Sequence, residues 1–112
     1  MKLEIKVDKT DDITIVKLIG NMDSNTAPMA ETEFNKMIAE SVNKLIVNLD
    51  ETVYVSSAGL RVFLATTKRM TAAGNVVKFC SPNEVVQEIL DISGFTSILD
   101  VKQTYSEAVA SL

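Results

Sequence analysis

Histidine is absent from the 112-residue chain, and Cys80 is its only cysteine. A zinc site built from cysteine and histidine therefore lacks ligands, and an internal disulfide has no second thiol. Serine or cysteine nucleophiles that depend on a histidine base are excluded as well, so hydrolases of that kind are ruled out. A single thiol is typical of a reducing compartment, and we expect a cytoplasmic protein.

The chain also lacks a strong positive charge, a glycine-rich loop and a long apolar run. Its 11 basic and 15 acidic side chains give a net charge of −4, which disfavours nonspecific binding to nucleic acid. It has only four glycines and no phosphate-binding loop, so no cofactor is predicted. No apolar stretch approaches the roughly 18 residues of a membrane span, and we expect no membrane partner. With 46% hydrophobic residues, the chain is expected to form one domain over residues 1–112.

Alternating polarity at the N-terminus predicts two strands. Leu3, Ile5 and Val7 alternate with polar residues, as in a half-buried strand. Residues 9–12 have turn chemistry, and the run 13–19 is rich in β-branched residues. The two runs together predict an antiparallel hairpin. Further short apolar strands are predicted at residues 44–49, 76–79 and 98–101.

Four amphipathic segments alternate with these strands, and their helices are expected to begin near Ser24, Ser56, Ser81 and Thr104. Ser24 or Asn25 is expected to open the first helix, with Pro28 in its first turn. Residues 81–84 (SPNE) and 104–107 (TYSE) are predicted capping boxes. The second helix is expected to bury Leu60, Phe63, Leu64, Thr67 and Met70. The order β-β-α-β-α-β-α-β-α predicts an α/β fold with a mixed sheet.

Residues 53–64 (VYVSSAGLRVFL) form the most informative segment, a connection into a helix that places two serines at the helix N-terminus. One hydroxyl can cap the helix, which leaves the other free toward solvent. Ala58 and Gly59 keep the first turn narrow, so another protein's backbone can approach closely. A phosphate here would face backbone N–H groups and the positive end of the helix dipole. The alternative is that both serines serve only as caps.

The segment Ser56-Ser57-Ala58-Gly59-Leu60, after the strand residues 46–50 (IVNLD), resembles the phosphorylatable segment of bacterial anti-sigma-factor antagonists, the STAS domain family. Residues 20–27 (GNMDSNTA) resemble that family's entry to its first helix, and residues 91–95 (DISGF) resemble the end of its third. The resemblance covers nearly the whole chain. It implies a single STAS-like domain with an N-terminal hairpin, a mixed sheet and about four helices.

The resemblance further implies a non-enzymatic binding module that phosphorylation controls. In the family, the unmodified antagonist binds an anti-sigma factor, often itself a serine kinase, and so frees a sigma factor. Phosphorylation of the serine at the start of the second helix breaks the complex, and a serine phosphatase restores it. Alignment on Gly59 and Leu60 makes Ser57 that serine, with Ser56 as the alternative. The family's frequent form is Asp-Ser-(Ser/Thr)-Gly-Leu, and here Ser56 and Ala58 stand in place of the Asp and the Ser/Thr.

A partner surface around this serine is also implied. Its expected members are Asp23, Ser24, Asn25, Thr26, Ser56, Ala58, Gly59 and Arg61. Residues 23–26 equally suit plain helix capping, and an exposed arginine is often simply solvated. The rival function is a scaffold or small-ligand-binding module of the same fold whose serines are never modified. The protein is expected to be a monomer or a weak homodimer.

Overall fold

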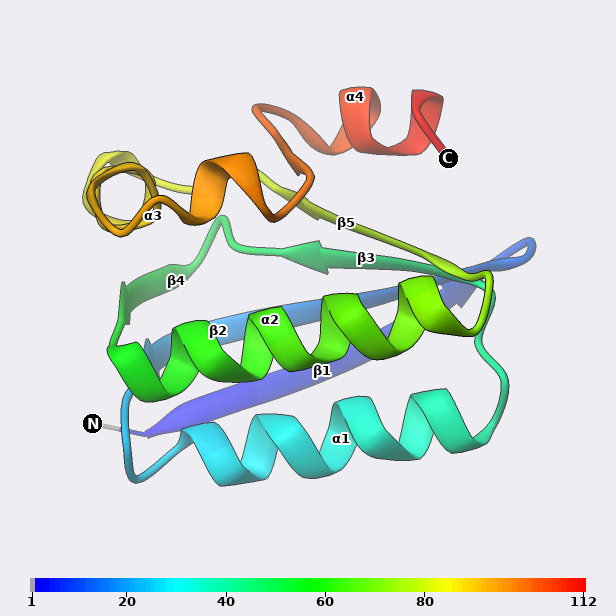
Figure 1. The fold of residues 1–112 in the computed structure, drawn as a ribbon, viewed down its shortest axis with the longest axis horizontal. Coiled ribbons are helices and arrows are strands. Elements are labelled where there is room, and N and C mark those ends of the chain that lie inside the picture. The colour runs from blue at the N-terminus through cyan, green and yellow to red at the C-terminus, as the bar shows by residue number, and fades with distance from the viewer. Residues whose placement is uncertain (1) are drawn as a thin grey trace.

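A computed structural model describes residues 2–112. Its elements in chain order are β1 (Leu3–Thr10), β2 (Ile13–Met22), α1 (Ala27–Ala39), β3 (Lys44–Asn48), β4 (Thr52–Val55), α2 (Ser57–Ala72), β5 (Val76–Cys80), α3 (Glu84–Ile92), a 3₁₀ turn (Phe95–Ser97), β6 (Val101–Lys102) and α4 (Tyr105–Ala110). Figure 1 shows the sheet in the middle, with α1 and α2 on one side and α4 on the other.

The sheet is mixed, as the sequence predicts. β1 and β2 form the antiparallel hairpin, with Leu3 opposite Gly20 and Thr10 opposite Ile13. The strand order is β1-β2-β3-β5-β6, and the pairings beyond the hairpin are parallel. The predicted α/β architecture with four helices is therefore confirmed.

The connection before the second helix contains an additional strand, β4, which the sequence pattern does not predict. β2 is ten residues long, so its first part pairs with β3 and its last residues pair with β4. The register shifts between Gly20 and Asn21, where β4 joins. Because of this irregularity, Val53 and Tyr54 are both exposed between a buried Thr52 and a buried Val55. The strand therefore lacks the alternation that would reveal it.

Apolar side chains fill the two faces of the sheet unequally. The main core lies under α1, α2 and α3, and its largest fully buried side chains include Phe34, Phe63 and Phe79. The ring centroids of Phe63 and Phe79 lie 5.0 Å apart, which ties α2 to β5. On the opposite face, α4 packs over a separate small cluster of Ile46, Cys80 and Ala108. Among residues 2–112, no helix combines the length and apolar character needed to cross a bilayer.

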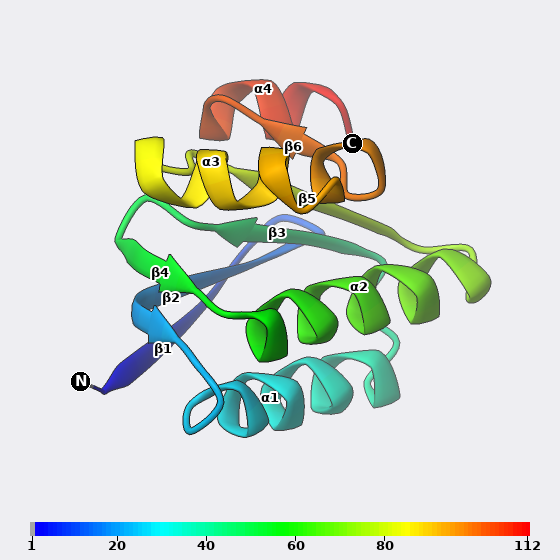
Figure 2. The same cartoon turned by 60° about the vertical axis from the view of Figure 1, so that its left-hand side comes forward.

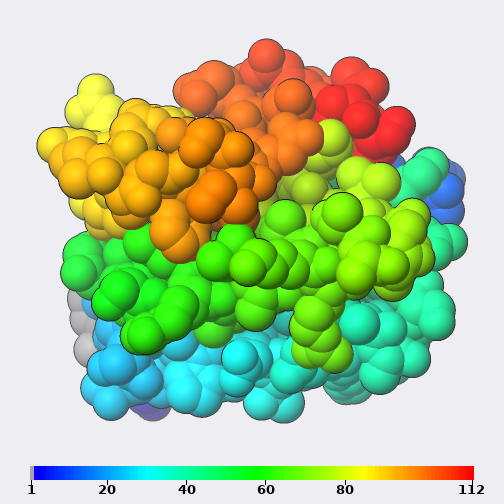
Figure 3. Space-filling model, viewed as in Figure 1, coloured from blue at the N-terminus to red at the C-terminus, as the bar shows by residue number. Residues whose placement is uncertain are grey.

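The second helix buries a different stripe from the one predicted. Leu60, Phe63 and Met70 are buried as expected, but Val62 and Thr66 are buried too, whereas Leu64 and Thr67 are only half-buried. The reason is that α2 packs against α1 as well as against the sheet. Figure 3 shows α1 and α2 as two adjoining bands, cyan and green, on the outer surface.

All four helices begin near the predicted residues, and at two of them the expected residue is the N-cap. Ser56 and Thr104 are the N-cap residues of α2 and α4. The Thr104 hydroxyl accepts a hydrogen bond from the Glu107 N–H at 3.1 Å, as in the predicted capping box. α1 begins at Ala27 with Thr26 as its N-cap residue, so neither Ser24 nor Asn25 opens the helix.

The capping box predicted at residues 81–84 is wrong. Asn83 is the N-cap of α3, and its side chain accepts a hydrogen bond from the Val86 N–H at 2.8 Å. Ser81 has a φ of 60° and its N–H donates to the Lys102 carbonyl at 3.1 Å, so it still belongs to the edge of the sheet. The last strand is also shorter than predicted, because β6 contains only Val101 and Lys102.

Candidate functional site

Two segments far apart in the sequence meet at one end of the sheet. They are residues 21–26, which follow β2 into α1, and residues 56–59 at the start of α2. The Ser56 N–H donates a hydrogen bond to the Met22 carbonyl at 2.7 Å. A Cβ atom on Gly59 would lie 2.9 Å from the same carbonyl oxygen, which is closer than such atoms approach. The absence of a side chain at Gly59 therefore lets α2 begin directly against the end of β2.

The turn before α1 is held by reciprocal hydrogen bonds. The Asp23 carboxylate accepts from the N–H groups of Asn25 and Thr26 at 2.9 and 3.0 Å. The Thr26 hydroxyl accepts from the Asp23 N–H at 2.9 Å and donates to the Asn21 carbonyl at 2.6 Å. The bond from Thr26, followed by that from Asn25, lowers the pKa of the Asp23 carboxyl below its ordinary value. The turn thus presents a fixed negative charge at neutral pH.

The two neighbouring serines have different positions. The Ser56 side chain is the N-cap and accepts from the Gly59 N–H at 3.4 Å. Ser57 is the first residue of α2, and its side chain is exposed. No acidic residue lies in the first turn of α2, so the positive end of the helix dipole is not neutralised there. One serine caps the helix and the other faces solvent, as the sequence predicts.

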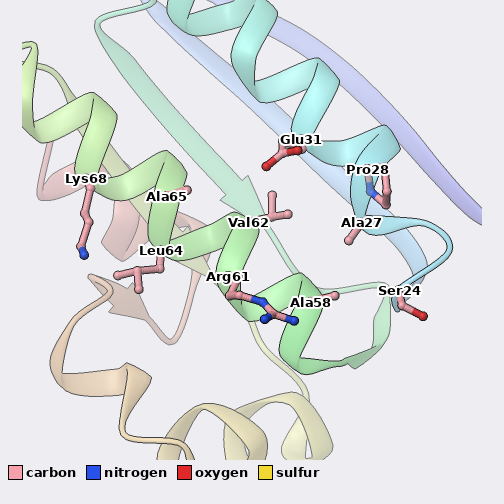
Figure 4. Close-up of a pocket in the computed structure, with 10 residues that line it drawn as sticks. All are labelled: Ser24, Ala27, Pro28, Glu31, Ala58, Arg61, Val62, Leu64, Ala65 and Lys68. Atoms are coloured by element: carbon pink, nitrogen blue, oxygen red, sulfur yellow. The ribbon is translucent and has the colours of Figure 1, made fainter.

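A groove of about 510 Å³ lies between α1 and α2, next to this helix start. We call it the α1–α2 groove; Figure 4 shows the residues that line it. Small or apolar residues make up most of its lining, and its charged members are Glu31 on α1 and Arg61 and Lys68 on α2. The remaining lining residues are Ser24, Ala27, Pro28, Ala58, Val62, Leu64 and Ala65.

Several residues expected at the partner surface lie here, and others lie beneath it. Ser24, Ala58 and Arg61 line the α1–α2 groove. Thr26 is only 9% exposed and Gly59 is buried, so these two shape the surface without presenting side chains to a partner. Asn25 is exposed in the turn.

Sequence reasoning missed the other lining residues of the groove, among them Pro28, Glu31 and Lys68. The helical spacing of Ala58, Arg61, Ala65 and Lys68 places these residues on one face of α2, and this spacing is the available signal. That α1 supplies the opposite wall becomes visible only in the fold.

Other chemically active side chains lie elsewhere. Asp50 and Glu51 precede β4, whereas Ser57 follows it. The carboxylates of Asp50 and Glu51 contact the Lys17 ammonium at 3.6 and 2.6 Å. The bond with Lys17 lowers the pKa of the Glu51 carboxyl. The Cys80 thiol is buried in the sheet, and burial raises its pKa. These groups therefore stand apart from the two serines.

Comparisons with known proteins identify the family of the chain. The family profile described as STAS domain matches residues 4–108. BtrV of Bordetella bronchiseptica, described as a candidate anti-sigma factor antagonist, is 30% identical over 97% of this chain and 94% of its own length. The anti-sigma F factor antagonist of Paenibacillus polymyxa is 26% identical over 100% of this chain and 97% of its own.

A solved structure has the same fold. SpoIIAA, a cell fate determinant of Bacillus in its phosphorylated form, superposes with a TM-score of 0.72 at 15% identity, covering 96% of this chain and 98% of that one. The profile match spans nearly all of the residues that the structure describes. The chain therefore belongs to the STAS domain family of anti-sigma factor antagonists.

Proposed function

We propose that this chain is an anti-sigma-factor antagonist that phosphorylation of Ser57 switches off. In its unmodified form it binds an anti-sigma factor that is also a serine kinase. Phosphorylation by that kinase releases the complex, and a serine phosphatase restores it. The chain acts in the cytoplasm as a binding protein without an enzymatic reaction of its own, and ATP belongs to the kinase.

The observation that carries this proposal is the difference between the two serines. Ser56 caps α2, so its hydroxyl has a structural role. Ser57 exposes its hydroxyl at the helix start, where a phosphate would meet N–H donors of the first turn. Modification of Ser57 therefore leaves the cap unchanged, whereas modification of Ser56 would alter the capping group itself.

The surface around Ser57 suits contact with another protein. The α1–α2 groove offers a lining of small residues, including Ala58, that lets a partner backbone approach closely. Asp23 supplies a negative charge and Arg61 a positive one, and charges of both signs favour a specific orientation of the partner. We propose that the contacts comprise Ser57 and the neighbouring residues Asp23, Ser24, Asn25, Ser56, Ala58 and Arg61, with Thr26 and Gly59 supporting them from below.

A phosphate on Ser57 would act mainly through the interface. It adds about −1.5 to −2 charges and three acceptor oxygens. A charge that becomes buried without a partner costs several kcal/mol, and a loss of about 2.7 kcal/mol already weakens a complex a hundredfold. Asp23 adds further negative charge to the same surface. We therefore expect phosphorylation to weaken the complex by at least about a hundredfold.

Two of the similar proteins support the proposal. The Paenibacillus relative is named as an antagonist of the anti-sigma F factor. The Bacillus protein of like fold exists in a phosphorylated form. These properties belong to those proteins, and they make a phosphorylation switch a reasonable proposal for this fold.

The test uses the anti-sigma factor that co-purifies with the unmodified chain from its native cells. After incubation with ATP and Mg²⁺, intact-mass analysis should find one added phosphate group, mapped to Ser57, and the complex should dissociate. Ser57→Ala should remain bound and unmodified, while Ser57→Asp should bind weakly from the start. Ser56→Ala is the matched control and should still be phosphorylated and released. Full phosphorylation of Ser57→Ala would show that another residue is the site.

The α1–α2 groove also supports a second candidate function, a scaffold or small-ligand-binding module. Its volume of about 510 Å³ is that of a small-molecule site, although its lining carries charges of both signs. Under this alternative, the chain purified from its native cells carries no phosphate under any growth condition. A small molecule would instead shift the resonances of residues that line the groove, such as Ala58 and Ala65.

A further inference from the structure

The outer edge of β1 is an open edge of the sheet. Among residues 2–112, β1 pairs with β2 on one side only, and Figure 2 shows it along the border of the sheet. Every residue from Lys6 to Thr10 is exposed, and Val7 is 45% exposed. An unpaired strand edge presents a row of N–H and C=O groups that another strand can bind.

Contacts of β2 reveal which way its backbone groups point. The Gly20 N–H donates to the Glu51 carbonyl at 3.0 Å, and the Leu18 carbonyl accepts from the Thr52 hydroxyl at 2.7 Å. Both partners belong to the segment that contains β4. The even-numbered residues in this part of β2 therefore direct their backbone groups away from β1.

The same reasoning orients the backbone of β1. Ile5 lies opposite Leu18, and Leu3 lies opposite Gly20. These are the pairs of an antiparallel ladder that share no backbone hydrogen bonds, so their N–H and C=O groups point outward on both strands. Leu3, Ile5 and, by alternation, Val7 thus present their backbone groups at the open edge.

The charges of β1 are arranged symmetrically about Ile5. Residues 2–8 read Lys-Leu-Glu-Ile-Lys-Val-Asp. When this segment is read in reverse, every position that carries a positive side chain receives a negative one, and every negative position receives a positive one. When two copies lie antiparallel with Ile5 opposite Ile5, Glu4 faces Lys6 of the second copy and Lys2 faces Asp8 of the second copy. The two copies are related by a twofold axis, so each of these two contacts occurs twice and the pairing makes four opposite-charge contacts.

The remaining side chains agree with this register. Leu3 faces Val7 of the second copy, so apolar residues meet on the face that carries α1. Lys6 and Glu4 form an ion pair with each other at 3.8 Å within the chain, and their side chains are 64% and 63% exposed. Pairing of two copies would therefore exchange this exposed contact for contacts across the edge. Opposite charges and apolar pairs directly across a ladder stabilise strand pairing.

Neighbouring registers bring like charges together. With Glu4 at the centre, Glu4 faces its own copy and Lys2 faces Lys6. With Lys6 at the centre, Lys6 faces its own copy and Glu4 faces Asp8. Like charges directly opposite one another are destabilising, so the charge pattern favours the register centred on Ile5 over the two adjacent registers.

We propose that β1 pairs antiparallel with β1 of a second copy of this chain, centred on Ile5, and joins two sheets into one in a reversible homodimer. The pairing uses none of the residues proposed to contact an anti-sigma factor. The dimer proposal is therefore independent of the Ser57 switch, and either proposal can be wrong without affecting the other.

The test measures the mass of the chain by analytical ultracentrifugation up to about 1 mM, the upper end of weak association. Glu4→Lys places a lysine opposite Lys6 of the second copy, and Lys6→Glu places a glutamate opposite Glu4 of the second copy. Each variant alone should weaken the dimer by at least about tenfold. Mixing the two variants restores opposite charges in a heterodimer, and the double variant Glu4→Lys/Lys6→Glu restores them in a homodimer.

Controls separate pairing from folding and net charge. Lys9→Glu changes the net charge as Lys6→Glu does but lies outside residues 2–8, so it should leave the dimer unchanged. Lys6 lies opposite Lys17 within the chain. Lys6→Glu replaces this like-charge contact with an opposite-charge one, so the variant should fold normally, and circular dichroism checks this. Hydrogen exchange should find the Ile5 and Val7 amides protected at high concentration and exposed at low concentration.

Two outcomes overturn the proposal. One is a wild-type chain that remains monomeric at about 1 mM. The other is a dimer that withstands both single charge changes, or that mixing of the two variants fails to restore. The second result would place the contact elsewhere on the molecule.

Discussion

Asp23 and Thr26 each bind the backbone of the other. The Asp23 carboxylate accepts from the Thr26 N–H at 3.0 Å, and the Thr26 hydroxyl accepts from the Asp23 N–H at 2.9 Å. The same hydroxyl donates to the Asn21 carbonyl, so one small side chain links the end of β2 to the start of α1. The turn beside Ser57 is therefore rigid before any partner binds.

Replacing Thr26 with valine should destabilise the fold. Valine keeps the shape of the side chain but leaves the Asn21 carbonyl and the Asp23 N–H without their partner. Loss of a partner for buried polar groups costs about 1–3 kcal/mol. Urea unfolding measures the change. Thr32→Val is the control, because the Thr32 hydroxyl bonds to Pro28 on an exposed helix surface, and we expect a change within about 0.5 kcal/mol.

The Asp23 charge should make stability depend on acid pH. Hydrogen bonds from Thr26 and Asn25 lower its pKa in the folded chain, so the folded state favours the carboxylate. The stabilisation is complete above the ordinary pKa of aspartate and is lost as the pH falls through the lowered value. The free energy of unfolding of the wild type minus that of Asp23→Asn should follow this course. The expectation would be contradicted if this difference in unfolding free energy stayed constant from neutral pH down to a pH below the lowered pKa of Asp23.

The two serines should differ in their effect on stability. Ser56→Ala removes the N-cap of α2 and should cost about 0.5–2 kcal/mol. The lower half of that range fits the long contact of 3.4 Å to the Gly59 N–H. Ser57→Ala changes an exposed side chain and should alter the free energy of unfolding by no more than about 0.5 kcal/mol. Equal losses from both variants would mean that both hydroxyls serve as caps.

A methyl group at Gly59 should be poorly tolerated. It would lie 2.9 Å from both the Met22 carbonyl oxygen and a methyl carbon of Val55. Alanine is the better helix former by about 1 kcal/mol, but overpacking typically costs about 1–3 kcal/mol, so Gly59→Ala should be destabilising. Gly74→Ala provides a comparison, because no atom of residues 2–112 outside Gly74 and its two chain neighbours lies within 4 Å of a Cβ atom there, and the positive φ is what opposes the change. Thermal unfolding of the two variants distinguishes the two effects, because Gly59→Ala reports the steric clash and Gly74→Ala reports the backbone strain.

Phosphorylation of Ser57 should leave the fold almost unchanged. The N–H groups and the dipole at the start of α2 favour a phosphate by about 0.3–1 kcal/mol, and the negative charge of Asp23 opposes it. The midpoint of thermal unfolding should therefore move by no more than about 4–8 °C, while partner affinity falls steeply. Chemical-shift changes that reach β1 would contradict this and point to a conformational switch.

Local features of the molecule were predictable from the sequence. The caps at Ser56 and Thr104 depend on residues within three positions, so a short motif contains all of their chemistry. The hairpin of β1 and β2 follows from alternation and an adjacent turn. That only one of the two neighbouring serines caps α2 was likewise a local expectation, and the choice of Ser57 came from the resemblance to the family.

Features that depend on distant contacts were not predictable. Ser81 fails to cap α3 because its N–H donates to Lys102, twenty-one positions further on. β4 escapes detection because its irregular pairing with β2 removes the alternation of buried and exposed residues. The α1–α2 groove requires two helices to lie side by side, which no periodicity within either helix specifies.

The separate cluster under α4 divides the chain into parts of unequal local stability. β6 contributes only Val101 and Lys102 to the sheet, and α4 rests on a cluster that shares no member with the main core. Few contacts therefore oppose local opening of residues 101–112, whereas β2 is paired along both edges. Thermal fluctuations should release the C-terminal segment first, while the turn at Asp23 and the start of α2 keep their shape because they are anchored to β2.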